Sequence, residues 1–344
     1  MAGRFPTDFK DRLKKKLVEQ IRGRNSGFLL GAGASFLNGN GYPLAAGLWP
    51  AIRDRMQDSD KRAIDDQIPR SCSTLEEALD AIDLGGKEEL PLRHRITGAI
   101  AKAFVDHKPP LEFHRTFVSR LSSRQEKRVP VFTLNYDVLM EHAADLEKCM
   151  LFDGFYGNVE SYFHPTCFND IRGRYESRRG KIISMPYRGI INLYKLHGSL
   201  GWYVDPSANL KRIRPEMSCP SGWRNLMIPP QNRKASDTGA TPYASLWSDF
   251  RAHLANDSPR LLNRLVCVGY GFCDGHVNAV INTGIARTHF TLIVLAKTLS
   301  DNAFNNLRVR QNVIVVTESR SSLYGEEGIG SPDSCMFEWL SKEM

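Results

Sequence analysis

Short continuous apolar runs recur along the chain, separated by longer stretches whose apolar positions follow a helical period. Each short run predicts a buried strand, because a strand covered on both faces carries apolar side chains at successive positions. We expect such strands at residues 27–30, 129–133, 190–196, 265–268, 292–295 and 313–316.

The stretches between these runs have the spacing of amphipathic helices. In the first twenty or so residues the apolar positions fall on one helical face, at Phe9, Leu13, Leu17 and Ile21. Further helices are expected at residues 44–57, over most of 60–125, and at about 136–146 and 276–287. Strands that alternate with helices favour an α/β fold: a Rossmann-like, mainly parallel sheet with helices on both faces, plus helical and irregular insertions.

We expect one domain, residues 1–344, with two marked insertions and a third irregular stretch. Residues 60–125 form a helical insertion that Pro109 and Pro110 interrupt, and residues 150–188 form an irregular insertion or small subdomain. Residues 205–242, rich in Pro, Ser and Asn, are also expected to be irregular.

Composition and charge narrow the class of protein. Hydrophobic residues make up 42% and charged residues 24%, as in ordinary globular proteins, and no apolar run is long enough for a membrane span. The N-terminal segment has no apolar core typical of a signal peptide, so we expect a cytoplasmic protein. A net charge of +8 fits an anionic partner, such as nucleic acid or a small anion, or a solvated basic surface. The scattering of the basic residues slightly favours the solvated surface.

The cysteine pattern argues against a zinc site or a disulfide framework. The seven cysteines are widely spaced and include no C-x-x-C pair. Cys267 lies in an apolar run and is expected to be a buried hydrophobic residue. We therefore expect no bound metal.

Glycine-rich or polar segments follow four of the predicted strands, and ligands of parallel sheets bind beyond the carboxyl ends of strands. The first is GAGAS, residues 31–35, whose glycines would let main-chain N–H groups approach a pyrophosphate. Phe36 breaks the G-x-G-x-x-G fingerprint. A tight structural turn explains the segment equally well.

The second and third segments are TLNYD, residues 133–137, and KLHGS, residues 195–199. Asn135 could hold a carboxamide, a ribose hydroxyl or a water, or it could cap the next helix. For Asp137 alone, a helix cap or a structural hydrogen bond is favoured. His197, at a strand end and before Gly198, is placed as a general base, against the structural role that most single histidines have.

The fourth segment, GYGFCDGH, covers residues 269–276. Its glycines suit close approach to a ribose or an adenine. Asp274 is equally suited to cap the following helix, and we interpret His276 as structural.

Taken in this order, the four segments resemble the motifs of the sirtuin-like family, over about residues 27–280. The resemblance implies that the chain binds NAD and that His197 is the catalytic histidine. It also implies that Asn135 and Asp137 line the nicotinamide-ribose pocket. It assigns contacts with the NAD phosphates and the two riboses to Gly31, Ala32, Gly33, Ser35, Gly269 and Gly271.

The chain departs from the deacetylase pattern of that family. It has no four-cysteine zinc module, and the stretch after GAGAS, FLNGNGYPLAAGLW, lacks an acidic residue followed by Phe-Arg. Leu134, Asn135 and Tyr136 stand where deacetylases have Gln-Asn-Ile or similar. These features are similar to the antiphage-defence branch of bacterial sirtuin-like proteins.

That resemblance implies an NAD glycohydrolase that releases nicotinamide and ADP-ribose and depletes NAD in abortive infection. It further implies a homo-oligomer and a protein partner such as a HerA-like ATPase. Two alternatives remain: an NAD-dependent protein deacylase, which needs an acyl-lysine peptide, and a non-catalytic NAD-sensing scaffold subunit. Binding to nucleic acid, which the net positive charge would allow, is less favoured than these functions.

Overall fold

The computed structural model describes residues 5–65, 75–76, 79, 90–157, 161–170, 172–217, 219–228, 241–256 and 259–344. Over these residues the centre of the molecule is a nine-stranded sheet with the order β16-β15-β14-β13-β12-β1-β2-β8-β3. Its strands are β1 (Ser26–Leu30), β2 (Arg128–Thr133), β3 (Leu151–Phe152), β8 (Ile190–Lys195), β12 (Arg264–Val268), β13 (Thr291–Leu295), β14 (Val313–Val316), β15 (Arg320–Leu323) and β16 (Glu326–Ile329).

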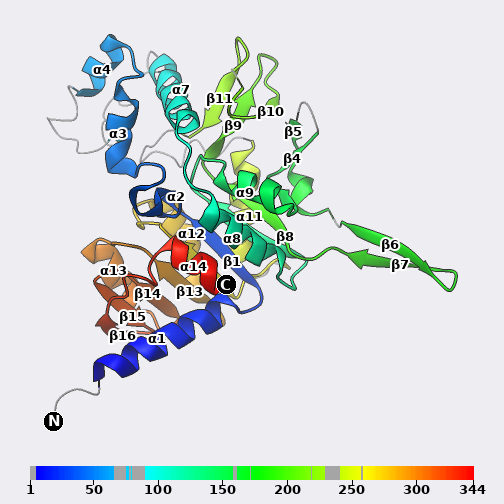
Figure 1. Cartoon of the computed structure of the whole chain (residues 1–344), viewed down its shortest axis with the longest axis vertical. Coiled ribbons are helices and arrows are strands. Elements are labelled where there is room, and N and C mark those ends of the chain that lie inside the picture. The colour runs from blue at the N-terminus through cyan, green and yellow to red at the C-terminus, as the bar shows by residue number, and fades with distance from the viewer. Residues whose placement is uncertain are drawn as a thin grey trace.

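The strands from β14 to β3 pair in parallel, and β15 and β16 add an antiparallel edge. Alternate side chains of each strand enter different cores: Phe28 and Leu30 point to one face of the sheet, and Leu29 points to the other. Helices cover both faces (Figure 1), so the expected Rossmann-like α/β architecture is confirmed.

The helices that cover the first face contribute to the same core as Phe28. They are α1 (Phe5–Ile21), α8 (Glu112–Ser122), α9 (Leu139–Glu147) and α14 (Phe337–Glu343). The helices on the second face pack around Leu29. They are α11 (Tyr243–Leu254), α12 (Gly275–Ile285) and α13 (Asp301–Arg308).

All six strands expected from the apolar runs are present, each within one residue of its predicted limits. The helix expected from about Tyr136 begins later, at Leu139. The main-chain N–H of Leu139 donates to Asp137 Oδ1 at 3.1 Å, so Asp137 holds a turn before the helix.

A third hydrophobic cluster lies beside the sheet and is built largely from the connection between β1 and β2. It contains side chains of α3 (Ala45–Arg53) and α7 (Leu90–Asp106), and α4 (Asp58–Asp65) adds Ile64. The later helix α8 instead packs against α9 and α14, on the sheet. The stretch expected to be a helical insertion therefore contributes both to this cluster and to the main body.

Residues 150–188, expected to be an irregular insertion or small subdomain, contain short strands, and some of them pair with strands from residues 198–227. A five-stranded second sheet has the order β11-β9-β10-β5-β4, and β6 pairs with β7 in a hairpin that extends away from the body (Figure 1). These strands are β4 (Phe155–Tyr156), β5 (Ser161–Phe163), β6 (Gly173–Arg178), β7 (Lys181–Pro186), β9 (Gly198–Val204), β10 (Leu210–Arg212) and β11 (Arg224–Met227). Arg179 and Gly180 make the hairpin turn with positive φ values of 52° and 74°, without the Asn-Gly or Asp-Gly pair that usually marks such a turn.

The described parts of the chain contain no helix that is both long and apolar enough to cross a lipid bilayer.

His114 lies in the core, where it should make stability depend on pH. Its side chain packs against Phe337, and burial lowers the pKa of His114 to about 4. The unfolded chain binds a proton at this residue below a pH of about 6.5, and the folded protein does not. The free energy of unfolding should therefore fall as the pH drops from 6.5 towards 4, by about 2 kcal/mol at pH 5.

Urea denaturation of His114→Gln at pH 7.5 and 5.0 measures this contribution. The variant should lose less stability between the two pH values than the wild type. His289→Gln, at an exposed position, is the control and should keep the wild-type difference. Equal differences in all three proteins would refute the assignment.

Candidate active site

A cavity of about 380 Å³ opens at the carboxyl ends of the central parallel strands, the position at which sheets of this kind bind ligands. Its volume is in the range of small-molecule sites. Segments that follow β1, β2, β8, β12 and β13 all border it. The nine residues assigned to the site from the sequence all line this cavity: Gly31, Ala32, Gly33, Ser35, Asn135, Asp137, His197, Gly269 and Gly271.

The glycines at the ends of β1 and β12 pack main chain against main chain. A Cβ on Gly31 would lie 2.5 Å from the carbonyl oxygen of Gly269, and a Cβ on Gly33 would lie 2.6 Å from Gly269 Cα. The N–H groups of Gly31, Gly33 and Ala34 donate to the carbonyl oxygens of Val268, Gly269 and Gly31. These glycines thus satisfy the packing of a tight turn, and these three donors are used inside the protein.

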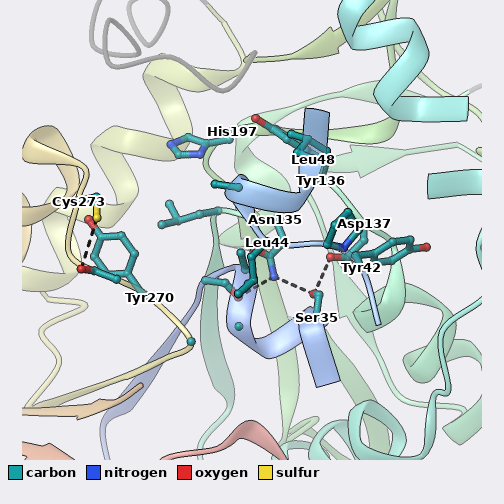
Figure 2. A pocket seen from close by; sticks show the side chains of 18 of the residues that line it. Ser35, Tyr42, Leu44, Leu48, Asn135, Tyr136, Asp137, His197, Tyr270 and Cys273 are labelled. Atoms are coloured by element: carbon teal, nitrogen blue, oxygen red, sulfur yellow. Dashed lines mark hydrogen bonds between the residues drawn. The ribbon is translucent and has the colours of Figure 1, made fainter. Parts of the chain in front are cut away.

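A buried hydrogen-bond chain links the ends of β1 and β2 (Figure 2). Asn135 Nδ2 donates to Ser35 Oγ at 2.9 Å, and Ser35 Oγ donates to Asp137 Oδ2 at 2.7 Å. Asn135 Nδ2 also donates to the Gly31 carbonyl oxygen at 3.0 Å. Ser35 and Asp137 are both at least 94% buried, so their main effect in this arrangement is to position Asn135.

These hydrogen bonds fix the orientation of the Asn135 side-chain amide. A carbonyl oxygen can only accept a hydrogen bond, so the atom beside Gly31 must be the amide nitrogen. The Ser35 hydroxyl donates its proton to Asp137 and therefore accepts from Asn135. Oδ1 of Asn135 is left as an acceptor at the border of the cavity.

His197 reaches the cavity from the junction between β8 and β9. Its exposed fraction is 2%, and its ring lies near Trp247 and His276, with centroid distances of 6.3 and 5.7 Å. The next residue, Gly198, has φ of +84°, and a Cβ there would collide with the carbonyl oxygen of Leu226. Gly198 thus permits the sharp bend that turns His197 toward the cavity. His276, interpreted as structural, packs against Trp247, with the two tilted rings 4.8 Å apart between centroids.

A largely buried ion pair between Lys195 and Glu141 lies next to the site. Lys195, the last residue of β8, donates from Nζ to Glu141 Oε1 at 2.8 Å and to the main-chain carbonyl oxygen of Asp137. The Lys195 side chain is 1% exposed and that of Glu141 is 19% exposed. Burial raises the pKa of Glu141, and the charge of Lys195 opposes that rise.

One wall of the cavity is apolar and comes from the connection between β1 and β2. It includes Tyr42, Leu44, Leu48 and Phe104, and the rings of Tyr42 and Phe104 stack at 4.3 Å. Burial raises the pKa of Tyr42, whose neutral hydroxyl donates to the Phe104 carbonyl oxygen at 3.1 Å. We did not predict this wall. Helical periodicity in residues 44–57 signals burial of Leu48 but not the surface against which it packs.

The opposite wall follows β12 and β13. Besides Gly269 and Gly271 it contains Tyr270 and Asp274, and the Tyr270 hydroxyl donates to Asn278 Oδ1 at 2.9 Å. Asp274 takes the N-cap position of α12 but makes no capping bond with its side chain. Lys297 and Thr298 complete this wall, and no strand-end motif had drawn attention to them.

Ser35→Ala should test the positioning of Asn135. The change removes a donor to the buried carboxylate of Asp137 and an acceptor for Asn135, so we expect a loss of about 1–3 kcal/mol in the free energy of unfolding. We also expect reduced ligand affinity or turnover in the folded variant. Ser123→Ala is the matched control, since that exposed hydroxyl donates only to a main-chain carbonyl oxygen one helical turn away. If Ser35→Ala were as stable as Ser123→Ala, the hydrogen bonds of Ser35 would not have the structural role described here.

Among the described residues, no group of three or more His, Cys, Asp or Glu side chains is placed to hold a metal ion.

Comparison with known proteins gives distant structural neighbours. No protein-family model matches the chain, and no curated protein matches it. A mutant Sir2 homologue in complex with ADP-ribose is 14% identical, with coverage of 96% of this chain and 95% of that one and a TM-score of 0.46. A Sir2 homologue–NAD complex is 15% identical over 83% of each chain, with a TM-score of 0.39. A Sir2 mutant with p53 peptide and NAD is 12% identical over 85% of this chain and 89% of that one, also at 0.39.

Proposed function

We propose that this chain hydrolyses NAD at the nicotinamide–ribose bond and releases nicotinamide and ADP-ribose. The observation that carries the proposal is the presence of Asn135 and His197 at one cavity, with the amide nitrogen of Asn135 bonded to the Gly31 carbonyl oxygen and Ser35 Oγ, which leaves Oδ1 as the acceptor of that side chain. The four segments that resemble sirtuin motifs, each at a strand end bordering that cavity, support NAD as the ligand.

The strand order gives the dinucleotide an orientation. β1 is central, with β2 and β8 on one side and β12 and β13 on the other. The nicotinamide half would lie over β2 and β8, beside Asn135 and His197, and the adenosine half would lie over β12 and β13. The pyrophosphate would cross near the turn at residues 31–35, since ligands cross such sheets where the strand order reverses.

The two side chains have distinct roles in the proposed reaction. The bond to nicotinamide breaks with oxocarbenium character at the ribose carbon, as glycosidic bonds do. Asn135 Oδ1 accepts a hydrogen bond from the nicotinamide carboxamide or from the attacking water. His197 accepts a proton from that water or from a ribose hydroxyl, since histidine is the side chain that most often acts as a general base.

The apolar wall limits the side from which water can reach the reacting bond. Tyr42, Leu44, Leu48 and Phe104 exclude bulk water from one side of the reacting bond. Water then reaches the ribose only where polar groups hold it.

The wider role follows from the resemblance alone. We propose that the enzyme depletes NAD in antiphage defence in the cytoplasm, as a homo-oligomer that acts with a protein partner such as a HerA-like ATPase.

Nicotinamide release from NAD by the purified full-length chain, followed by chromatography, tests the proposal. We expect nicotinamide and ADP-ribose in equal amounts, with no peptide added. Release that occurs only with an acyl-lysine peptide would replace the proposal by a deacylase. NAD binding without release, in the presence and absence of peptide, would indicate the sensing scaffold.

A further inference from the structure

The wall of the cavity beyond β12 includes a lysine that the proposed hydrolysis does not use. Lys297 and Thr298 follow β13, which pairs in parallel with β12. The main-chain N–H of Gly269 donates to the Leu295 carbonyl oxygen at 2.8 Å, so the segment after β13 continues beside the glycine turn after β12. Lys297 thus lies on the side of the cavity away from Asn135 and His197.

The spacing of the strands indicates which part of a dinucleotide Lys297 faces. Neighbouring strands are about 4.8 Å apart, so the end of β13 lies about 10 Å from the end of β1. A pyrophosphate that crosses at the turn after β1 leaves the adenosine ribose to lie near the ends of β12 and β13. Lys297 is therefore nearer to the ribose than to the pyrophosphate.

The charges of the cavity make Lys297 distinctive. Among the described residues that line it, Lys297 is the one lysine or arginine, and the acidic residues are Glu76, Asp137 and Asp274. Lys297 is exposed, and it forms no ion pair with a carboxylate in the described part of the chain. Its ammonium group is available to an anionic ligand.

Dinucleotide sites distinguish their ligands at the adenosine ribose. Sites for NAD place an acidic residue against the ribose hydroxyls, whereas sites for NADP place a cationic one near the 2′-phosphate. A Thr hydroxyl beside the cation adds a donor to phosphate oxygens.

We propose that Lys297, together with Thr298, forms a subsite for a phosphate group on the adenosine ribose, so that the site prefers 2′-phosphorylated dinucleotides such as NADP to NAD. The inference rests on the proposed function for the orientation of the ligand. Asp274 is the acidic residue on the same wall and opposes this preference, because its charge repels a phosphate.

Two mononucleotides that differ only in the 2′-phosphate isolate the subsite, and neither has a bond that the enzyme can break. We would measure the dissociation constants of adenosine 2′,5′-bisphosphate and adenosine 5′-monophosphate for the wild type by calorimetry. The bisphosphate should bind about tenfold more tightly, the effect of one charge-assisted contact. Lys297→Ala should remove this ratio, Lys297→Glu should invert it, and Asp274→Asn should increase it.

Lys14→Ala is the matched control, since Lys14 is an exposed lysine of α1 and does not line the cavity. It should keep the wild-type ratio. The ratio of kcat/KM for NADP to that for NAD should follow the same order across the variants.

The outcomes separate the two proposals. A ratio unchanged by Lys297→Ala, with NAD still hydrolysed, overturns the phosphate subsite and leaves the hydrolase. An equal loss of affinity for both mononucleotides overturns it as well, and assigns Lys297 to the 5′-phosphate. A ratio that depends on Lys297, without hydrolysis of either dinucleotide, keeps the subsite and overturns the hydrolase.

Discussion

Replacing His197 by alanine should lower the rate of nicotinamide release from NAD by about 10²–10⁴-fold, the usual contribution of a general base. The loss should appear in kcat, because the proton is accepted while the bond to nicotinamide breaks. The folded state should persist, since the bend at this position depends on Gly198 and on the main-chain bond from Ile228 to the His197 carbonyl oxygen.

Asn135 gives the companion experiment. Asn135→Ala removes the acceptor at the ligand and should reduce turnover by a similar factor. Asn135→Asp keeps an acceptor but cannot donate to Gly31 and Ser35, so it should also lose turnover. His289→Ala, at an exposed position on another part of the surface, is the control and should turn over NAD normally. Near-wild-type turnover in His197→Ala or Asn135→Ala would remove these residues from the mechanism.

Replacing Lys195 by methionine should give the largest loss of stability, about 3–5 kcal/mol in the free energy of unfolding. The change leaves the carboxylate of Glu141 without its cation in a largely buried position and frees the carbonyl oxygen of Asp137. Chemical denaturation measures the effect. Because Asp137 positions Asn135 through Ser35, the folded fraction should also turn over more slowly.

A double variant distinguishes the loss of the pair from the loss of packing. Lys195→Met with Glu141→Leu removes both charges and should recover at least half of the lost stability. Arg12→Ala breaks an exposed pair with Glu326 and should leave the free energy of unfolding nearly unchanged, because water and salt screen such pairs. A double variant as unstable as Lys195→Met alone would show that the uncompensated charge is not the cause.

The sheet could be predicted from the sequence because its strands are apolar on both faces. A run such as residues 313–316 has no polar position that could face solvent, so only a buried strand fits it at that length. The edge strands and the hairpin escaped prediction for the opposite reason. Their exposed side chains, such as Tyr175 and Ile182, do not alternate regularly with polar ones.

The cavity was predicted where glycine or a polar residue follows a buried strand. Such positions stand out because the preceding residues are uniformly apolar. Phe104 and Lys297 could not be found in this way, since each looks ordinary in its own segment. Phe104 becomes part of the site through the packing of α7, and Lys297 through the neighbouring position of β12 and β13.

The interlocked glycines at the ends of β1 and β12 bear on how relatives of this chain should be recognised. Since neighbouring main-chain atoms occupy the space that a Cβ on Gly31, Gly33 or Gly269 would need, a relative that lost all catalytic activity would still have to keep these glycines. These glycines therefore indicate the fold, and selection for the proposed reaction would act on positions 135 and 197. The residues at those two positions would distinguish active relatives from inactive ones, whereas the glycines would be common to both groups.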